Sequence, residues 1–159
     1  ITESDELVAK VLLDKDSPFL KSLIVNKGSK DKVSLGMAVL DENYLVGKIV
    51  EVNYTTSRVL LISDLNSKIP VIIEPGNVQS ILSGSGKDQG VIQYFRSSRE
   101  ITSDNIVFTS GSGGIFKAGI PIGKIENVQT NKNYNTDFFS NLDQLTFVKL
   151  VSYQKESKN

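Results

Sequence analysis

The sequence contains no cysteine, no histidine and no tryptophan among its 159 residues. Without cysteine the chain can form no disulfide framework and offers no thiol for chemistry. Without histidine it lacks the usual general base of enzymes and the commonest metal ligand in proteins. These absences exclude disulfide-stabilised folds and cysteine enzymes, and they leave few routes to acid–base catalysis.

An excess of charge of one sign is also missing, because 18 Lys and Arg residues balance 18 Asp and Glu residues. A chain with zero net charge creates no strong field that would attract nucleic acid or an acidic membrane surface. No run of 18 apolar residues is present that could span a bilayer. The chain starts at Ile1 without a signal-peptide pattern, so we expect a fragment of a longer protein, with room for an anchor upstream.

What the chain does contain is a series of short, β-branched apolar runs separated by turn residues. No alternation of strands with long helices appears, which argues against a doubly wound sheet. Many short strands with Gly, Asn, Asp and Ser between them are typical of an all-β barrel or sandwich. The expected strands cover residues 7–13, 23–26, 44–52, 58–62, 69–73, 90–95, 105–109, 120–128 and 145–151.

Two segments have weak helical features. In segment 1–13 one helical face would carry Leu7, Val8, Val11 and Leu12, but the segment also suits a strand, which we favour from Val8 to Leu13. Ser140 is a possible N-cap with Asp143 three residues later, which predicts a single helical turn. Little helix is therefore expected overall.

The glycines suggest an internal repeat. In each half a Gly-Ser pair is followed eight residues later by a second glycine and then by a Gly-Lys-Ile segment. Such a repeat predicts two related small barrels, although turn-rich segments can also match by chance. The three glycines are Gly28, Gly36 and Gly47 in the first copy and Gly111, Gly119 and Gly123 in the second.

A phosphate-binding loop is one interpretation of the glycine-rich segments. A P-loop requires G-x-x-x-x-G-K-[ST], but around Gly86-Lys87 the first glycine is replaced by Ile81 and the final Ser or Thr by Asp88. A dinucleotide loop also fails, because no helix is expected after Gly114 to face a pyrophosphate. The sequence therefore predicts no nucleotide cofactor.

A nucleophilic serine is the other chemical interpretation, since "SGSGG" (110–114) is similar to the loop around a serine-protease nucleophile. Activation of Ser112 requires a base within hydrogen-bond reach, normally histidine. A buried lysine is the only other side chain that could act as this base, and no feature of the sequence predicts that a lysine is buried. The acidic residues also form no calcium loop, so no catalytic, cofactor-binding or metal-binding residue is assigned.

A structural role accounts for every glycine in these patterns. Turn glycines permit the positive φ of tight reversals, and an isolated glycine within a strand usually marks a bulge or a barrel corner. Gly47 and Gly123 lie within expected strands and are assigned to bulges. The full set of structural glycines is Gly28, Gly36, Gly47, Gly111, Gly114, Gly119 and Gly123.

Adjacent aromatic residues are the candidates for partner binding. Neighbouring residues of a strand face opposite sides, so one member of the pair Tyr94-Phe95 and one of Phe138-Phe139 can be exposed. An exposed aromatic ring can anchor a partner, whereas packing at the edge of the core is the alternative. We expect the second barrel to carry part of a partner or self-association surface.

Four segments in order carry a family resemblance: "PFLKSLIVNKGSKDKVSLGMAVLDENYLVGKIVEV", "SRVLLISDLNSKIPV", "FTSGSGGIFKAGIPIGKIENV" and "FFSNLDQLTFVKL". Together they resemble the MreC family of bacterial rod-shape-determining proteins, from about Val8 to Val151. The resemblance implies two small β-barrels related to the chymotrypsin-like double barrel. The implied divisions are 1–7 as the end of an upstream coiled coil, 8–75 and 76–153 as the barrels, and 154–159 as a polar tail.

The boundary between the barrels is expected at the Pro-Gly turn Glu74–Asn77, and the final strand can return to either barrel. The resemblance further implies a non-enzymatic periplasmic scaffold of the cell elongation machinery, anchored in the inner membrane by an N-terminal helix. Its implied partners are a class B penicillin-binding protein, MreD, MreB, RodZ and further copies of itself, with no nucleic acid. The alternatives are a serine hydrolase on a double barrel and a peptidoglycan-binding module.

Overall fold

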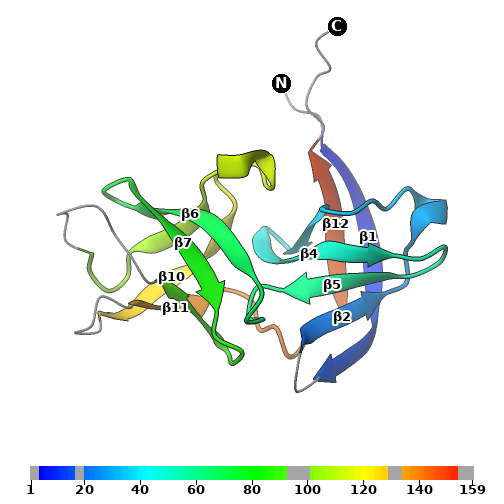
Figure 1. The fold of residues 1–159 in the computed structure, drawn as a ribbon, viewed down its shortest axis with the longest axis horizontal. Helices are drawn as coiled ribbons and strands as arrows, with labels where there is room; N and C mark the ends of the chain where they lie inside the picture. The colour runs from blue at the N-terminus through cyan, green and yellow to red at the C-terminus, as the bar shows by residue number, and fades with distance from the viewer. Residues whose placement is uncertain (1–3, 17–19, 93–100, 129–133, 154–159) are drawn as a thin grey trace, which may run out of the picture.

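The computed structural model describes residues 4–16, 20–92, 101–128 and 134–153. Within these ranges the chain forms twelve β-strands and two short 3-10 turns. The strands close into two six-stranded antiparallel barrels, which lie side by side along the long axis of the molecule (Figure 1). The prediction of an all-β fold with two small barrels and little helix is confirmed.

The first barrel combines strands from both ends of the described chain. Its strand order is β1-β12-β3-β4-β5-β2. The last strand thus joins the first barrel, which was one of the two predicted possibilities. The members are β1 (Ser4–Asp16), β2 (Lys21–Val25), β3 (Ala38–Asp41), β4 (Tyr44–Val52), β5 (Ser57–Leu61) and β12 (Phe147–Tyr153).

The second barrel is continuous in sequence. Its strand order is β10-β11-β8-β7-β6-β9. Each inward residue of a strand alternates with an outward one, as in β6, where Ile69, Val71 and Ile73 are buried. The members are β6 (Lys68–Glu74), β7 (Val78–Gly84), β8 (Gln89–Ile92), β9 (Ile106–Thr109), β10 (Pro121–Val128) and β11 (Tyr134–Phe138).

The boundary between the barrels differs from the prediction. The turn at Glu74–Asn77 joins β6 to β7, which pair along residues 68–73 inside the second barrel. The chain crosses between barrels earlier, in residues 62–67. A Pro-Gly turn suits a hairpin as well as a crossing, so local turn chemistry could not distinguish the two.

The start of the chain also differs from the prediction of a coiled-coil end over 1–7. Residues 4–7 belong to β1 and pair with β12, with Ser4 opposite Tyr153 and Leu7 opposite Leu150. Residues 1–3 and the predicted polar tail 154–159 lie outside the described residues. The hydrophilic and apolar residues that alternate in "SDELVAK" fit a strand because a partner strand from the far end of the chain is available.

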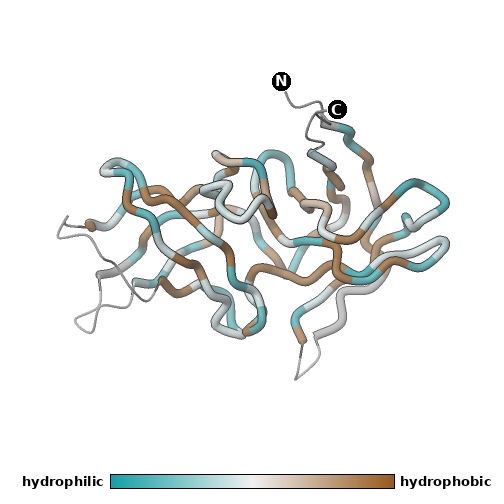
Figure 2. Tube along the Cα trace, turned by 45° about the horizontal axis from the view of Figure 1, so that its top comes forward, coloured by the Kyte–Doolittle hydropathy of each residue, from teal (hydrophilic) through white to brown (hydrophobic). Residues whose placement is uncertain are grey.

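The hydrophobic core follows the inward faces of both barrels. Large side chains with almost no exposed surface include Leu23, Ile49 and Leu150 in the first barrel and Leu82, Ile92 and Ile125 in the second. Figure 2 shows hydrophobic residues along the strands, with hydrophilic residues mainly in the connections. Burial of apolar side chains inside two small closed barrels is the main stabilising contribution.

The two barrels repeat one strand arrangement. If β12 is counted as the first strand of its barrel, and β6 as the first of the other, both barrels have the cyclic order 1-2-3-6-5-4. Gly47 of β4 pairs with β3 and β5, and Gly123 of β10 pairs with the equivalent strands β9 and β11. The pairing register shifts by one residue next to each glycine, between β3 and β4 and between β9 and β10.

The internal repeat predicted from the sequence pairs Gly47 correctly with Gly123. It pairs Gly36 with the wrong residue. Gly36 donates its N–H to the carbonyl of Ile49 (2.8 Å), and Asp104 donates to the carbonyl of Ile125 (3.0 Å). Both donors have positive φ, 87° for Gly36 and 74° for Asp104. The structural counterpart of Gly36 is therefore Asp104 rather than Gly119, and the replacement of glycine by aspartate concealed the match.

Candidate functional site

The glycine-rich loop after β9 is a closed turn. Gly111, Gly113 and Gly114 have positive φ around the 3-10 turn η2 (Ser112–Gly114). Thr109 closes the loop, because its hydroxyl donates to the carbonyl of Lys117 (2.6 Å) and accepts from the N–H of Ile120 (2.9 Å). Ser112 is exposed within this turn. The loop geometry is that of a strand reversal, with its polar groups bonded to one another.

Two physical reasons apply to the seven glycines singled out by sequence. Where φ is positive, a side chain is strained, whereas elsewhere a Cβ atom would overlap neighbouring backbone atoms. At Gly123 the overlap is with the carbonyl oxygen of Asp137, and at Gly47 with that of Leu60. Positive φ applies to Gly36, Gly111, Gly114 and Gly119, and lack of space applies to Gly28, Gly47 and Gly123.

The crossing between the barrels is organised by Asp64. Its side chain is buried, with only 2% of the residue exposed. One carboxylate oxygen accepts the N–H of Lys21 (2.6 Å) at the start of β2, and the other accepts the N–H of Asn66 (2.8 Å). Asp64 thus joins the crossing to the first barrel. In the sequence this residue lies between the expected strands 58–62 and 69–73, and its one local signal is the Asx-turn pattern Asp-x-Asn.

The same crossing contacts the β7–β8 hairpin of the second barrel. The carbonyl of Ser63 accepts the N–H of Gly86 (2.8 Å), and Ser67 and Gly84 share a backbone hydrogen bond of 3.1 Å. A side chain at Gly84 would overlap the carbonyl oxygen of Asp64. The absence of a side chain therefore lets the hairpin approach the crossing closely.

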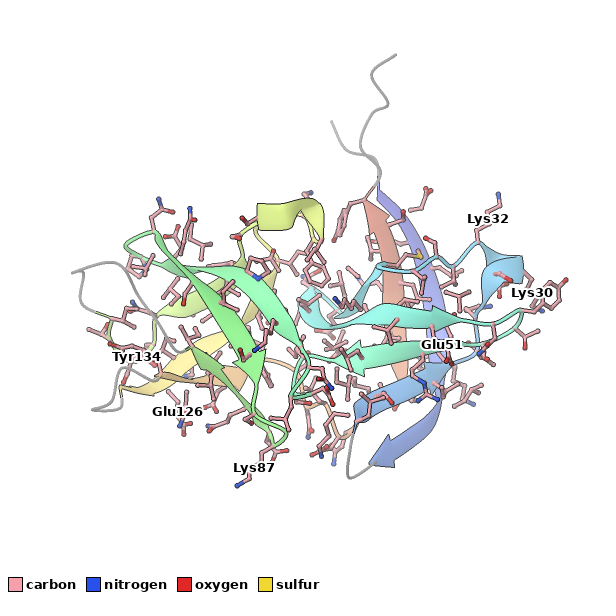
Figure 3. All side chains as sticks on the ribbon, in the orientation of Figure 1. Lys30, Lys32, Glu51, Lys87, Glu126 and Tyr134 are labelled. Atoms are coloured by element: carbon pink, nitrogen blue, oxygen red, sulfur yellow. The ribbon has the colours of Figure 1, made fainter. Side chains whose placement is uncertain are left out.

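A cleft of about 530 Å³ lies between the barrels on this side. Its wall includes the start of β2, the end of β5, the β7–β8 hairpin, and the connection from β11 to β12. Ser22, Ser63 and Ser140 are its buried serines. Lys87 lies on the exposed rim, and Figure 3 shows it extending from the hairpin tip. We call this space the inter-barrel cleft.

The four aromatic residues predicted to bind a partner differ in their surroundings and exposure. Tyr94 and Phe95 lie outside the described residues. Phe138 is half-buried and packs against the core. Phe139 is 37% exposed, and its ring centroid lies 5.0 Å from that of Tyr44 in the first barrel. Phe139 therefore contacts the other barrel and borders the inter-barrel cleft.

The predicted helical turn at Ser140 is absent from the connection between β11 and β12. Asn141 makes the turn instead, since its side chain accepts the N–H of Asp143 (3.1 Å) and its carbonyl accepts the N–H of Gln144 (3.2 Å). The Ser140 hydroxyl is buried and has no hydrogen-bond partner. Asn and Ser side chains can both accept backbone N–H groups at the start of a turn. Here Asn141 takes this role, so the turn begins one residue later than predicted.

A second groove of about 700 Å³ lies between the η2 loop, residues 34–38 and the end of β12. Leu35 and Ile115 are exposed on its lining. The ammonium group of Lys117 lies 5.8 Å from the centre of the Tyr153 ring, which links the loop to the first barrel. Burial raises the pKa of the Tyr153 hydroxyl, and the nearby negative charge of Glu6 raises it further.

An apolar surface on the first barrel was not anticipated from sequence. Val8, Leu12 and Phe147 are each more than half exposed on the adjacent strands β1 and β12. Lys10 lies opposite Phe147, and Lys149 lies opposite Val8. We call these three apolar residues the β1–β12 patch. Their alternation with buried residues places them on the outer face of the barrel.

Two further features concern only the described ranges 4–16, 20–92, 101–128 and 134–153. No group of three or more His, Cys, Asp or Glu residues there is close enough to hold a metal ion. No helix in that part of the chain is long and apolar enough to cross a bilayer.

Comparison with known proteins identifies relatives over most of the chain. Residues 11–152 match the family model described as rod shape-determining protein MreC, barrel core. The cell shape-determining protein MreC of Caulobacter vibrioides is 37% identical over 115 residues. That alignment covers 72% of this chain and 33% of the relative, so the chain spans only about a third of that protein's length.

Solved structures agree with this match. MreC from Pseudomonas aeruginosa superimposes with a TM-score of 0.85 at 27% identity, over 92% of this chain and 98% of that one. A complex between penicillin-binding protein PBP2 and MreC from Helicobacter pylori has the same fold at 17% identity, with a TM-score of 0.68 over 93% and 98% of the two chains. The resemblance predicted from the sequence segments is thus confirmed, and the chain belongs to the MreC family of rod shape-determining proteins.

Proposed function

We propose that this chain is the periplasmic, non-enzymatic part of a scaffold that maintains rod shape by organising peptidoglycan-synthesis proteins. The observation that carries the proposal is the match of residues 11–152 to the barrel core of a shape-determining family. An inner-membrane anchor upstream of the barrels is part of the proposal. The barrels would then present protein-binding surfaces outside the cytoplasm at a fixed distance from the membrane.

The absence of histidine from the sequence supports a role without catalysis. Ser112 is exposed in the glycine-rich turn, and the hydroxyl of Thr109 is bonded to the loop backbone. A serine nucleophile needs a base held against it, which this turn does not supply. A fluorophosphonate probe tests the alternative hydrolase, since covalent labelling that Ser112→Ala abolishes would contradict the scaffold proposal.

The proposed principal partner is a class B penicillin-binding protein. A structurally similar MreC from Helicobacter pylori is known in complex with PBP2. MreD, MreB and RodZ complete the proposed assembly. Zero net charge favours apolar contacts over long-range electrostatic steering, so binding should depend weakly on salt.

The four aromatics Tyr94, Phe95, Phe138 and Phe139 remain our candidates for partner contacts on the second barrel. Of the two that the structure describes, Phe139 has the larger exposed surface, but part of its ring contacts Tyr44. We therefore expect changes at Phe139 to affect both partner binding and the junction between the barrels.

A second candidate surface serves self-association. The β1–β12 patch exposes three large apolar side chains on neighbouring strands, a feature that often marks an interface between proteins. Because the patch lies on the first barrel, it leaves the second barrel free for another partner. Phe147→Ser should reduce self-association in analytical ultracentrifugation, without a change in partner binding.

The decisive experiment is co-purification of this chain with the class B penicillin-binding protein of its own organism. Retention of the two proteins together, and a larger loss of retention in Phe139→Ser than in Tyr44→Ser, which removes the same ring contact, would support the proposal. Tyr54→Ser is a matched control, since Tyr54 is an exposed aromatic in the β4–β5 turn, away from the second barrel. No retention by the unchanged chain at micromolar concentrations would overturn it.

A further inference from the structure

The inter-barrel cleft has the size and construction of a small-molecule site. Its volume of about 530 Å³ lies within the range of about 300–1,000 Å³ that is common for such sites. Segments from both barrels line it, so the pocket exists only in the folded double barrel. Sites between two structural units are frequent places for ligands.

The walls of the cleft are held in place by hydrogen bonds. Ser22 is buried, and its hydroxyl accepts a hydrogen bond from the guanidinium of Arg58 (2.9 Å). Ser63 is buried and accepts the N–H of Gly86 through its carbonyl (2.8 Å). Next to it, Asp64 fixes the backbone of Lys21. A ligand would therefore meet a preorganised surface and would lose little binding energy in ordering it.

The charged groups of the lining balance each other. An anion would be attracted by the lysines but repelled by the aspartates, and a cation the reverse. Several of these charges already have partners, since Lys124 lies 3.7 Å from Asp104 and Asp137 accepts a hydrogen bond from Gln89 (2.8 Å). A neutral ligand with many hydrogen-bonding groups fits such a lining best. The charged residues are Lys21, Lys87, Lys124, Asp88, Asp137 and Asp143.

The connection after β11 adds hydroxyl and amide groups. Ser140 is only 8% exposed, and its hydroxyl has no hydrogen-bond partner. A buried hydroxyl without a partner is unfavourable, and a hydroxyl can both donate and accept. Asn141, next in sequence, is exposed and also lines the cleft. A ligand at this wall would contact the side-chain amide of Asn141, because the Ser140 hydroxyl lies below the accessible surface.

The same connection provides an aromatic surface. Phe139 borders the cleft and is 37% exposed, although one part of its ring contacts Tyr44. Aromatic rings beside planar polar side chains suit sugar rings, which present apolar C–H faces and hydroxyl edges together. The combination of balanced charge, exposed amide and carboxylate groups, and a ring therefore points to one chemical class.

We propose that the inter-barrel cleft binds a neutral saccharide of a few sugar units, with hydroxyl groups facing Asn141 and Asp143 and a ring face against Phe139. This inference goes beyond the scaffold function and is independent of it. Saccharide binding would give the double barrel direct contact with a glycan, in addition to any contact with proteins.

The test is titration of the ¹⁵N-labelled chain with four probes, followed by amide chemical shifts. The probes are maltotriose, the trisaccharide of N-acetylglucosamine, inorganic phosphate and the zwitterionic dipeptide Ala-Ala, each to about 20 mM because weak saccharide sites bind in the millimolar range. We expect at least one trisaccharide to shift the amides of residues 139–143 and 85–88. If phosphate or the dipeptide binds there more tightly than both trisaccharides, or if neither trisaccharide binds, the proposal is wrong.

Variants then separate binding from folding. Asn141→Ala should weaken saccharide binding about fivefold, whereas Ser140→Ala removes an unpaired hydroxyl below the surface and should leave binding unchanged and the melting temperature unchanged or raised. Asp143→Ala should weaken binding to a similar degree. The matched control is Asp5→Ala, an exposed aspartate on β1 of the first barrel. Equal binding by Asn141→Ala, Asp143→Ala and the unchanged chain would place the saccharide elsewhere and contradict the proposal.

Lys87 provides a further comparison between exposed lysines. Lys87 lies on the cleft rim, whereas Lys30 lies at the far end of the first barrel (Figure 3). Lys87→Ala should weaken trisaccharide binding, and Lys30→Ala should leave it unchanged. An equal effect of both changes would indicate a general charge effect and would overturn the assignment of the site.

Discussion

The two barrels have the same strand order, but only the second is built from strands that are consecutive in the sequence. The second barrel uses six consecutive strands, from Lys68 to Phe138. In the first barrel, β12 from the far end of the chain occupies the position that β6 has in the second barrel, so that Ser4 lies opposite Tyr153. One barrel therefore closes through local connections, and the other closes only when the chain ends meet.

This difference has an energetic consequence. Strands that are distant in sequence must meet at a higher cost in loop-closure entropy before their contacts form. β12 contributes Val148, Leu150 and Val151 to the buried core of the first barrel. The first barrel should therefore depend on the last strand, whereas the second should fold from its own segment.

Truncation after Leu145 tests this comparison most strongly. Without β12 the first barrel loses two strand pairings, those with β1 and β3, and exposes its core. We expect loss of dispersed amide signals from residues 4–61 and their retention for residues 68–138. A truncated chain that keeps both barrels folded would refute the proposed dependence.

Asp64→Ala should have the next largest effect. The change removes the acceptor of two backbone N–H groups, those of Lys21 and Asn66, and lowers the free energy of unfolding by about 2–5 kcal/mol. We expect thermal unfolding by calorimetry to separate into two transitions, because the crossing no longer holds β2. Asp64→Asn keeps one carbonyl acceptor and should have an intermediate free energy of unfolding. The control Asp88→Ala, at an exposed residue, should have the same free energy of unfolding as the unchanged chain.

Glycine substitutions test whether the barrels are equivalent. Gly47→Val and Gly123→Val each introduce an overlap with a carbonyl of the neighbouring strand, at Leu60 and Asp137 respectively. Each should lower the free energy of unfolding by about 1–3 kcal/mol in denaturant titrations. Tolerance of valine at one site alone would show that the two positions are not counterparts.

A milder substitution supplies the control for this comparison. Gly36 has positive φ but open space around it, and its counterpart Asp104 has the same type of conformation. Gly36→Asn should therefore cost less than either valine change, because Asn tolerates the left-handed region. A loss as large as that of Gly47→Val would contradict the equivalence of Gly36 and Asp104.

The smallest effect concerns the paired ends of the first barrel. Burial and Glu6 both raise the pKa of Tyr153, so the neutral phenol is favoured in the folded state. This contribution to stability is complete below the ordinary tyrosine pKa of about 10 and is lost as pH rises through the higher folded value. Glu6→Gln should lower the pKa of Tyr153 slightly in an ultraviolet titration, with Tyr153→Phe as the reference. No change would mean that Glu6 does not act on the ring.

The local order of the chain was largely predictable from the sequence. Alternating β-branched runs predict the strands, as in residues 69–73, which lie within β6. The bulges beside Gly47 and Gly123 also follow from local pattern, since a glycine there interrupts an otherwise regular strand. The lack of histidine is a matter of composition alone and follows directly from the sequence. These features depend on residue types and on neighbours that are close in sequence.

Tertiary structure alone decided which strands close each barrel and which residues surround the inter-barrel cleft. The turn at Glu74–Asn77 and the crossing at Asp64 both contain turn-forming residues, and their different roles depend on which distant strands pair on either side. Likewise, Phe139 meets Tyr44 and Asp64 meets Lys21 only after both barrels have formed. Hydropathy and turn propensity record the preferences of neighbouring residues, whereas strand pairing and burial between distant segments depend on the packing of the whole chain.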